Sequence, residues 1–194
     1  MSEQANTADN AGLKAVREWF TVVTVALLIA FVVRGFVLQQ FYISGPSMES
    51  TLFQNNRVLV NKLSYRLHDI GYGDVVVFDR VTTNGVEVQH DDLIKRVIGL
   101  PGDTVSIAQC VVSVNGKVIS EPYLNSFDLS QSNLDDRCRV PEMATITVEP
   151  HHLFVMGDNR PQSFDSRMFG TIDEKLVVGR AFAIIWPFNA LRWL

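Results

Sequence analysis

The chain has 194 residues, 47% of them hydrophobic, so it is long enough to bury one core and to carry an appendage. Its 17 basic and 21 acidic residues give a net charge of −4, and lysine and arginine do not cluster. These properties argue against a surface that follows nucleic-acid phosphates.

An apolar run near the N-terminus is the first distinctive element. Trp19–Val33 contains no charged residue, and Arg34 is the only charge in the run as far as Leu38. A helix needs roughly 20 apolar residues to cross a bilayer, and the run reaches that length if Arg34 extends to the far interface. We predict one transmembrane helix at residues 15–38.

A cleaved secretory signal and a buried core helix are the alternatives for this run. The run continues into bulky residues such as Phe36 and Phe41, without the small-residue cleavage site of a signal peptide, which favours a retained anchor. Lys14 and Arg17 precede the run and favour a cytoplasmic N-terminus. Residues 1–14 are small and polar, and we predict a disordered cytoplasmic tail there.

Residues 39–194 show short apolar runs with period-two alternation, which predicts a mainly β domain. Asn115-Gly116 between two such runs indicates a hairpin with positive φ at both turn residues. If the domain lies outside the membrane, Cys110 and Cys138 are candidates for a disulfide; two unrelated buried thiols are the alternative. The four histidines show no ligand spacing with the cysteines, so we expect no metal.

Ser47 is a lone hydroxyl in a Gly-Pro turn, in the stretch FYISGPSMESTLF. A serine needs a proton acceptor to act as a nucleophile, and either histidine or a desolvated lysine can serve. The histidines lack a triad-like setting. In DLIKRVIGLPGD, strand alternation places Lys95 on one face with Leu93 and Val97, where apolar neighbours would favour its neutral form. An edge strand with its charges in water is the alternative.

A third polar segment, FVMGDNRPQSFDSRMFG, lies between hydrophobic residues. Its aspartates and arginines interleave with serines, a pattern that suits fixed bidentate ion pairs. A plain surface loop is the alternative.

Together these segments resemble the type I signal peptidases, peptidase family S26, which are membrane-anchored Ser-Lys proteases. GPSMESTL resembles the nucleophile motif, GDVVVF a structural strand, DLIKRVIGLPGD the lysine motif, and MGDNRPQSFDSRMFG the last motif. The motifs occur in family order after one span. The resemblance implies a mainly β signal-peptidase fold, a single-pass cell-membrane protein, and a catalytic domain on the extracytoplasmic side.

By this resemblance Ser47 is the nucleophile, Lys95 is the general base, and Ser163 orients the lysine amine by a hydrogen bond. Four further residues would form supporting ion pairs, with Asp165 paired to Arg167 and Asp158 to Arg96. The backbone N–H of Ser47 would meet the oxyanion.

Two positions depart from the family pattern. Some members carry a serine where this chain has Gly45, and the family usually has proline where this chain has Ser50.

The expected activity is cleavage of signal peptides from exported preproteins after a small-x-small motif, without a cofactor. Successive strand residues point to opposite faces, so two small side chains of an extended peptide would enter shallow pockets. The candidate wall residues, each of which could equally be core, are Ile43, Met48, Leu52, Leu93 and Ile94. We expect signal peptides and membrane lipid as partners, no nucleic acid, and a monomer.

Two other hypotheses remain. A relative of the self-cleaving SOS repressors also uses a Ser-Lys pair, but it would need a DNA-binding domain where this chain has an apolar run. A catalytically inactive, membrane-tethered β-domain that binds exported polypeptides would not need the serines and the lysine together.

Overall fold

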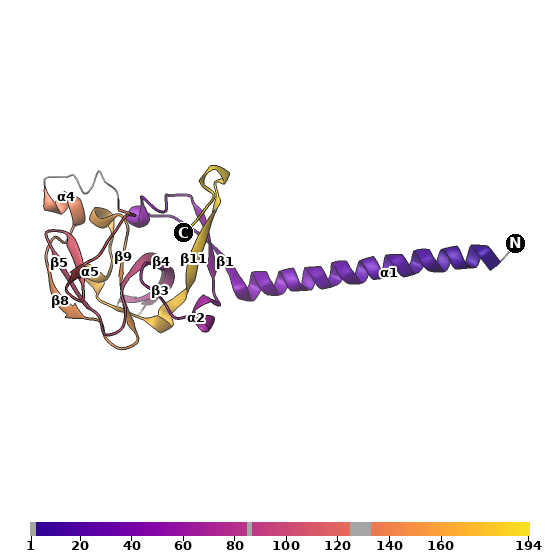
Figure 1. Cartoon of the computed structure of the whole chain (residues 1–194), viewed down its shortest axis with the longest axis horizontal. Coiled ribbons are helices and arrows are strands. Elements are labelled where there is room, and N and C mark those ends of the chain that lie inside the picture. The colour runs from indigo at the N-terminus through magenta and orange to yellow at the C-terminus, as the bar shows by residue number, and fades with distance from the viewer. Residues whose placement is uncertain (1–2, 85–86, 125–132) are drawn as a thin grey trace. The chain divides into compact units, whose positions relative to one another are not determined.

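The computed structural model describes residues 3–84, 87–124 and 133–194. The chain divides into two units, residues 1–39 and residues 40–194. Figure 1 shows the long N-terminal helix and the β-rich remainder.

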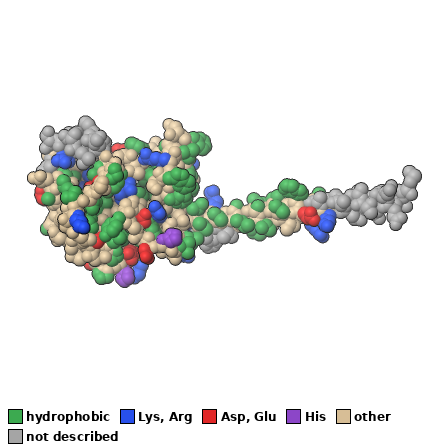
Figure 2. Space-filling view, viewed as in Figure 1, with side chains coloured by type: hydrophobic (Ala, Val, Ile, Leu, Met, Phe, Trp, Pro, Cys, Tyr) green, Lys and Arg blue, Asp and Glu red, His purple; other side chains and the backbone are tan. Residues whose placement is uncertain are grey.

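The N-terminal unit is dominated by the helix α1 (Glu3–Val32), which continues into a π-helical turn at Val33–Val37. Within it, the 20 residues Val16–Gly35 are long and apolar enough to cross a membrane. Apolar side chains line the described part of this helix and are exposed (Figure 2). This segment lies inside the predicted span of residues 15–38, although Leu38 already belongs to a strand.

The residues before this span differ from the prediction. The sequence predicts a disordered tail at residues 1–14, whereas the structure has helix from Glu3 onward. The apolar segment supplies a helical nucleus, and extending an existing helix by one residue costs far less than starting one. Ala5, Ala8 and Ala11 favour that extension.

The C-terminal unit is mainly β, which confirms the predicted fold class. Its large sheet has the strand order β1-β2-β11-β3-β4-β9-β10, and β12 pairs with β11. Its strands are β1 (Leu38–Tyr42), β2 (Arg57–Asn61), β3 (Val75–Asn84), β4 (Glu87–Gly99), β9 (His152–Met156), β10 (Ile172–Asp173), β11 (Val177–Trp186) and β12 (Arg192–Trp193).

A smaller sheet has the order β7-β6-β5-β8. Its strands are β5 (Thr104–Ala108), β6 (Val111–Val114), β7 (Lys117–Val118) and β8 (Met143–Thr147). The predicted hairpin joins β6 to β7, with φ of 53° at Asn115 and 73° at Gly116. Positive φ at both residues matches the twist of the flanking strands, which is why this dipeptide marks the turn.

Short helices connect the strands. They are α2 (Ser64–Leu67), α4 (Leu134–Cys138) and α5 (Ser166–Phe169), with 3-10 helices at Pro46–Met48, Arg160–Gln162, Glu174–Leu176 and Phe188–Ala190. A disulfide joins Cys110, in the turn between β5 and β6, to Cys138 at the end of α4. It therefore ties the end of the long loop after β7 to the smaller sheet.

Side-chain alternation along β3 builds two of the three hydrophobic clusters. Val75 and Val77 pack in the first cluster, whereas Val76 and Phe78 pack in the third, on the opposite face. The second cluster lies between the smaller sheet and the ends of β4 and β9. The central strands β3 and β4 are therefore fixed from both sides, and β4 carries the predicted lysine motif.

Candidate active site

Ser47 lies in the 3-10 helix Pro46–Met48, just after β1. Proline fixes its own φ near the helical value and starts the turn. Met48, with no solvent exposure, anchors the turn in the first cluster, whereas Ser47 is only half-buried. The carbonyl oxygen of Ser47 accepts a hydrogen bond from the N–H of Asn159 at 3.1 Å. The last motif thus fixes the backbone of the serine turn.

Lys95 lies on β4, opposite Val76 of β3, and is 2% exposed. Its Nζ donates hydrogen bonds to Ser47 Oγ at 2.8 Å and to the carbonyl oxygen of Ile94 at 2.9 Å. The predicted strand alternation holds, because Leu93 and Val97 both pack in the third cluster whereas Ile94 packs in the first. The structure therefore brings the serine and the lysine of two distant segments into direct contact.

The environment of Lys95 favours the neutral amine. Burial lowers the pKa of Lys95 to about 8, because an ammonium loses its hydration in the interior. The carboxylates of Asp165 and Asp158 act in the opposite direction, and the nearby Arg167 guanidinium offsets part of their effect. Desolvation is the largest influence, so the amine can lose its proton near neutral pH.

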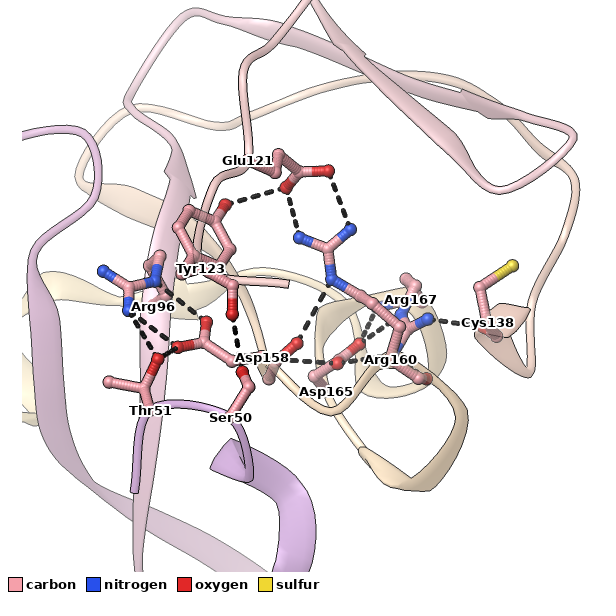
Figure 3. A network of polar contacts seen from close by, with 11 residues as sticks. Ser50, Thr51, Arg96, Glu121, Tyr123, Cys138, Asp158, Arg160, Asp165 and Arg167 are labelled. Atoms are coloured by element: carbon pink, nitrogen blue, oxygen red, sulfur yellow. Dashed lines mark hydrogen bonds and ion pairs between the residues drawn. The ribbon is translucent and has the colours of Figure 1, made fainter. Parts of the chain in front are cut away.

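Two bidentate ion pairs contain the carboxylates that act on Lys95. Figure 3 shows both pairs. Arg96 donates through Nε and Nη2 to Asp158 at 2.8 and 2.6 Å, and Arg167 donates through the same two atoms to Asp165, both at 2.7 Å. Burial acts to raise the pKa of Asp165, but hydrogen bonds from Arg167 and from the N–H of Gly157 outweigh it and hold that pKa below its usual value. Both carboxylates are therefore fixed in place.

Ser163 does not make the predicted hydrogen bond to the lysine. It is fully buried, and among the described residues its Oγ makes no hydrogen bond of ordinary geometry, although the hydroxyl is close enough to the Asp165 carboxylate to help lower the pKa of that group. The reason is geometric, since the amine of Lys95 is directed to Ser47 and Ile94 instead. Ser163 nevertheless lies beside the serine turn, because a Cβ added to Gly157 would overlap both Ser163 Oγ and the Ser47 carbonyl oxygen.

The predicted pocket walls are mostly core. Ile43 is 4% exposed, and Met48 and Leu52 are not exposed at all, so these three side chains present almost no surface to a peptide. They pack in the first cluster, on which the serine turn rests. Leu93 and Ile94 are half-buried, and they pack against clusters on opposite faces of the sheet. A peptide bound on one face of the sheet could therefore contact only one of these two side chains.

One edge of β4 is open beside the lysine. β3 pairs with β4 along its whole length, but β9 pairs only with the stretch from Arg96 to Gly99. Within the described part of the chain, no strand pairs with the other edge of residues 88–95. Unpaired N–H and C=O groups at such an edge can hold an added extended peptide.

Several contacts around the site could not be read from the sequence. Thr51 donates to Asp158 at 2.5 Å, and the buried Arg160 pairs with Glu121. Tyr123 lies against Arg96, with the guanidinium carbon 4.1 Å from the ring centroid. Glu121 and Tyr123 belong to an aperiodic loop, so only the folded chain shows that they reach the motifs.

The family model described as "Signal peptidase, peptidase S26" matches residues 16–186. This chain belongs to that family. Membership identifies it as a serine endopeptidase of the signal peptidase I type. The family is membrane-associated, in agreement with an N-terminal helix that is long and apolar enough for one crossing.

Two curated signal peptidases illustrate the similarity. The chain is 38% identical to the probable signal peptidase I-2 of Synechocystis sp. over 167 residues, which cover 86% of this chain and 71% of the relative. It is 36% identical to signal peptidase IB of Staphylococcus aureus (strain MRSA252) over 189 residues, or 93% of this chain and 94% of the relative. A solved signal peptidase I from Enterococcus faecalis V583 is 30% identical, with a TM-score of 0.45, and covers 58% of this chain and 97% of its own.

Proposed function

We propose that this signal peptidase cleaves signal peptides from exported preproteins after a small-x-small motif, with Ser47 as nucleophile and Lys95 as general base. The observation that carries the proposal is the 2.8 Å contact between Lys95 Nζ and Ser47 Oγ, with the lysine almost fully buried. A base must lie within hydrogen-bond reach of the proton it removes and titrate near the working pH. Lys95 meets both conditions.

The reaction follows from this geometry. The lone pair of the neutral Lys95 amine accepts the hydroxyl proton of Ser47 while Oγ attacks the scissile carbonyl carbon. The Lys95 ammonium then gives that proton to the leaving amine nitrogen as the C–N bond breaks and an acyl-enzyme remains. A water, deprotonated by the same amine, hydrolyses the ester and restores Ser47.

Charge that develops in this reaction has partners on the protein. The carboxylates of Asp165 and Asp158 favour the ammonium form of Lys95 while it carries the transferred proton. The N–H of Ser47 is the donor available for the oxyanion, and one such donor contributes on the order of 3 kcal/mol to the transition state. Among the described residues this N–H makes no backbone hydrogen bond outside its own turn.

The open edge of β4 supports extended binding of the substrate. A peptide hydrogen-bonded along residues 88–95 would run toward Lys95 and Ser47, and alternate side chains would face the protein. Small side chains at the first and third positions before the cut suit this surface, because the neighbouring side chains of the serine turn are packed in the core and leave little depth.

The proposed location is the membrane, with the helix α1 as a single-pass anchor and the β-rich unit on the extracytoplasmic side. The disulfide between Cys110 and Cys138 supports this side, because disulfides persist in oxidising compartments. Anchoring raises the effective concentration of the site near emerging cleavage sites. The partners are signal peptides and membrane lipid, and the working form is a monomer.

Cleavage of a preprotein by the detergent-solubilised full chain tests the proposal, with Ser47→Ala and Lys95→Ala as inactive variants. Lys117→Ala is the matched control, since this lysine is exposed on β7. We expect the parent and the control to cut after the small-x-small site. Equal cleavage by all four proteins would exclude the Ser-Lys mechanism, and no cleavage by any of them would favour an inactive domain that binds exported polypeptides.

A further inference from the structure

The backbone at Ser50 has an unusual conformation. Its φ is 88°, a left-handed value that is strained for any residue other than glycine. Proline, which the family usually has at this place, fixes φ near −65° and could not adopt it. The strained backbone after Ser47 therefore needs contacts with the rest of the chain to hold its conformation.

The hydroxyl of Ser50 supplies one such contact. Its Oγ donates to the carbonyl oxygen of Tyr123 at 2.5 Å, although the two residues lie 73 positions apart. Ser50 is three residues after the nucleophile, so this bond holds the serine turn directly.

Tyr123 also contacts the lysine strand. The Arg96 guanidinium lies over its ring at 4.1 Å from the centroid, a cation–π distance, and Arg96 follows Lys95 on β4. The phenol donates to Glu121 at 2.7 Å. Burial, together with the Glu121 carboxylate, raises the pKa of Tyr123, so the phenol remains a neutral donor at working pH.

Glu121 reaches the last motif. Its two carboxylate oxygens accept from both terminal nitrogens of Arg160, whose side chain is buried, while the Glu121 side chain is 9% exposed. Arg160 follows Asn159, whose N–H holds the carbonyl oxygen of Ser47. Figure 3 shows Tyr123 between Arg96 and Glu121, with Arg160 on the far side of Glu121.

We propose that residues 121–123, here called the strap, are a positioning element that holds the serine turn, the lysine strand and the last motif in register. This proposal rests on the proposed Ser-Lys function. The strap touches none of the reacting atoms. It acts through Ser50, Arg96 and Arg160, which lie one to three residues from Ser47, Lys95 and Asn159 respectively.

Removing a strap contact is expected to lower kcat more than it changes KM, because the Ser47 to Lys95 distance matters for chemistry and not for peptide binding. Ser50→Ala removes a net hydrogen bond of about 1 kcal/mol, which corresponds to a loss of about fivefold in kcat. Ser50→Pro should lose more, about a hundredfold, because its ring forbids the observed φ. Ser120→Ala, an exposed serine next to the strap, is the matched control.

Substitutions of Tyr123 separate its ring from its hydroxyl. Tyr123→Leu loses both the Arg96 contact and the bond to Glu121, and we expect a loss of about tenfold or more in kcat. Tyr123→Phe keeps the ring and should recover most of that loss. A further readout is the midpoint of the acid limb of the pH profile. Water that enters a loosened site would hydrate the Lys95 ammonium and move this midpoint upward, while the charges of Asp165, Asp158 and Arg167 around Lys95 stay the same.

The outcomes distinguish the two proposals. If Ser47→Ala cleaves as fast as the parent, the Ser-Lys function itself fails. If the parent cleaves, Ser47→Ala does not, and the Ser50 and Tyr123 variants match the parent in kcat and acid limb, then the strap proposal is wrong. The same conclusion follows if the lost activity equals the lost folded fraction, measured by titrating active sites, or if Ser50→Pro is as active as the parent.

Discussion

The rate of cleavage should depend on pH through Lys95. Its pKa is lowered from 10.5 to about 8, mainly by burial. With the ordinary value, about three molecules in ten thousand would carry a neutral amine at pH 7, whereas a pKa of about 8 gives about one in ten. The lowered pKa therefore increases the reactive fraction about 300-fold at pH 7. We expect kcat/KM to rise with pH, reach half its maximum near pH 8 and level off above it.

The same shift has a consequence for stability with a definite sign. The unfolded chain holds the lysine proton up to about pH 10.5, and the folded chain only up to about pH 8. Folding therefore carries a penalty of about 3 kcal/mol below pH 8, which is relieved as the pH rises from 8 to 10.5. Lys95→Met removes the penalty but leaves two hydrogen-bond acceptors without their donor, at about 1 kcal/mol each. At pH 7 this variant should be inactive and about 1 kcal/mol more stable.

Two measurements on the detergent-solubilised full chain check this reasoning. Initial rates on a preprotein between pH 5.5 and 9.5 give the midpoint of the acid limb, with substrate kept well below KM. Denaturant titrations of the parent and Lys95→Met at pH 7 and above pH 10 give the stability difference, which should reverse in sign at the higher pH. An acid limb centred below pH 6, or a stability difference independent of pH, would refute desolvation of Lys95 as the source of its basicity.

Three further substitutions test the surroundings of the site. Gly157→Ala places a methyl group against Ser163 and the serine turn. We expect activity to fall at least about a hundredfold and the temperature of unfolding to drop. Cleavage at the parent rate would contradict this packing. Cys110→Ser removes a disulfide that spans 28 residues and should lower the free energy of unfolding by about 3 kcal/mol. An unchanged denaturation midpoint would show that the disulfide does not stabilise the fold. Gly45→Ser should fold normally, because the backbone is extended there and a Cβ meets nothing within 4 Å. Its hydroxyl would add an oxyanion donor, so we expect kcat to rise about a hundredfold, and an unchanged or lower kcat would count against that donor.

Sequence patterns predicted most of the fold because they act locally. Alternation identified the strands, the Asn115-Gly116 dipeptide located a hairpin, and the apolar run located the N-terminal helix. The helical tail from Glu3 was not predicted, because its polar composition suggested disorder and gave no sign that a neighbouring helix would extend into it.

The candidate site was only partly predictable. The apolar neighbours of Lys95 in its strand indicated a buried amine, and the interleaved charges of the last motif indicated ion pairs, both of which the structure contains. Proximity to Ser47 in sequence could not tell a pocket wall from a core residue, and the side chains of Met48 and Leu52 pack in the core with no exposed surface. The strap could not be predicted, because a loop without periodicity gives no indication in the sequence of the residues that it contacts.

The open edge of β4 also bears on self-association. An edge that accepts one extended peptide can pair with the same edge of a second copy, which is a route to aggregation. Asp91 and Asp92 lie on this stretch, and Asp92 is exposed. Two copies that met edge to edge would bring these carboxylates together, whereas a signal peptide without acidic residues would meet no such repulsion. The edge can therefore remain available to substrate without joining one enzyme molecule to another.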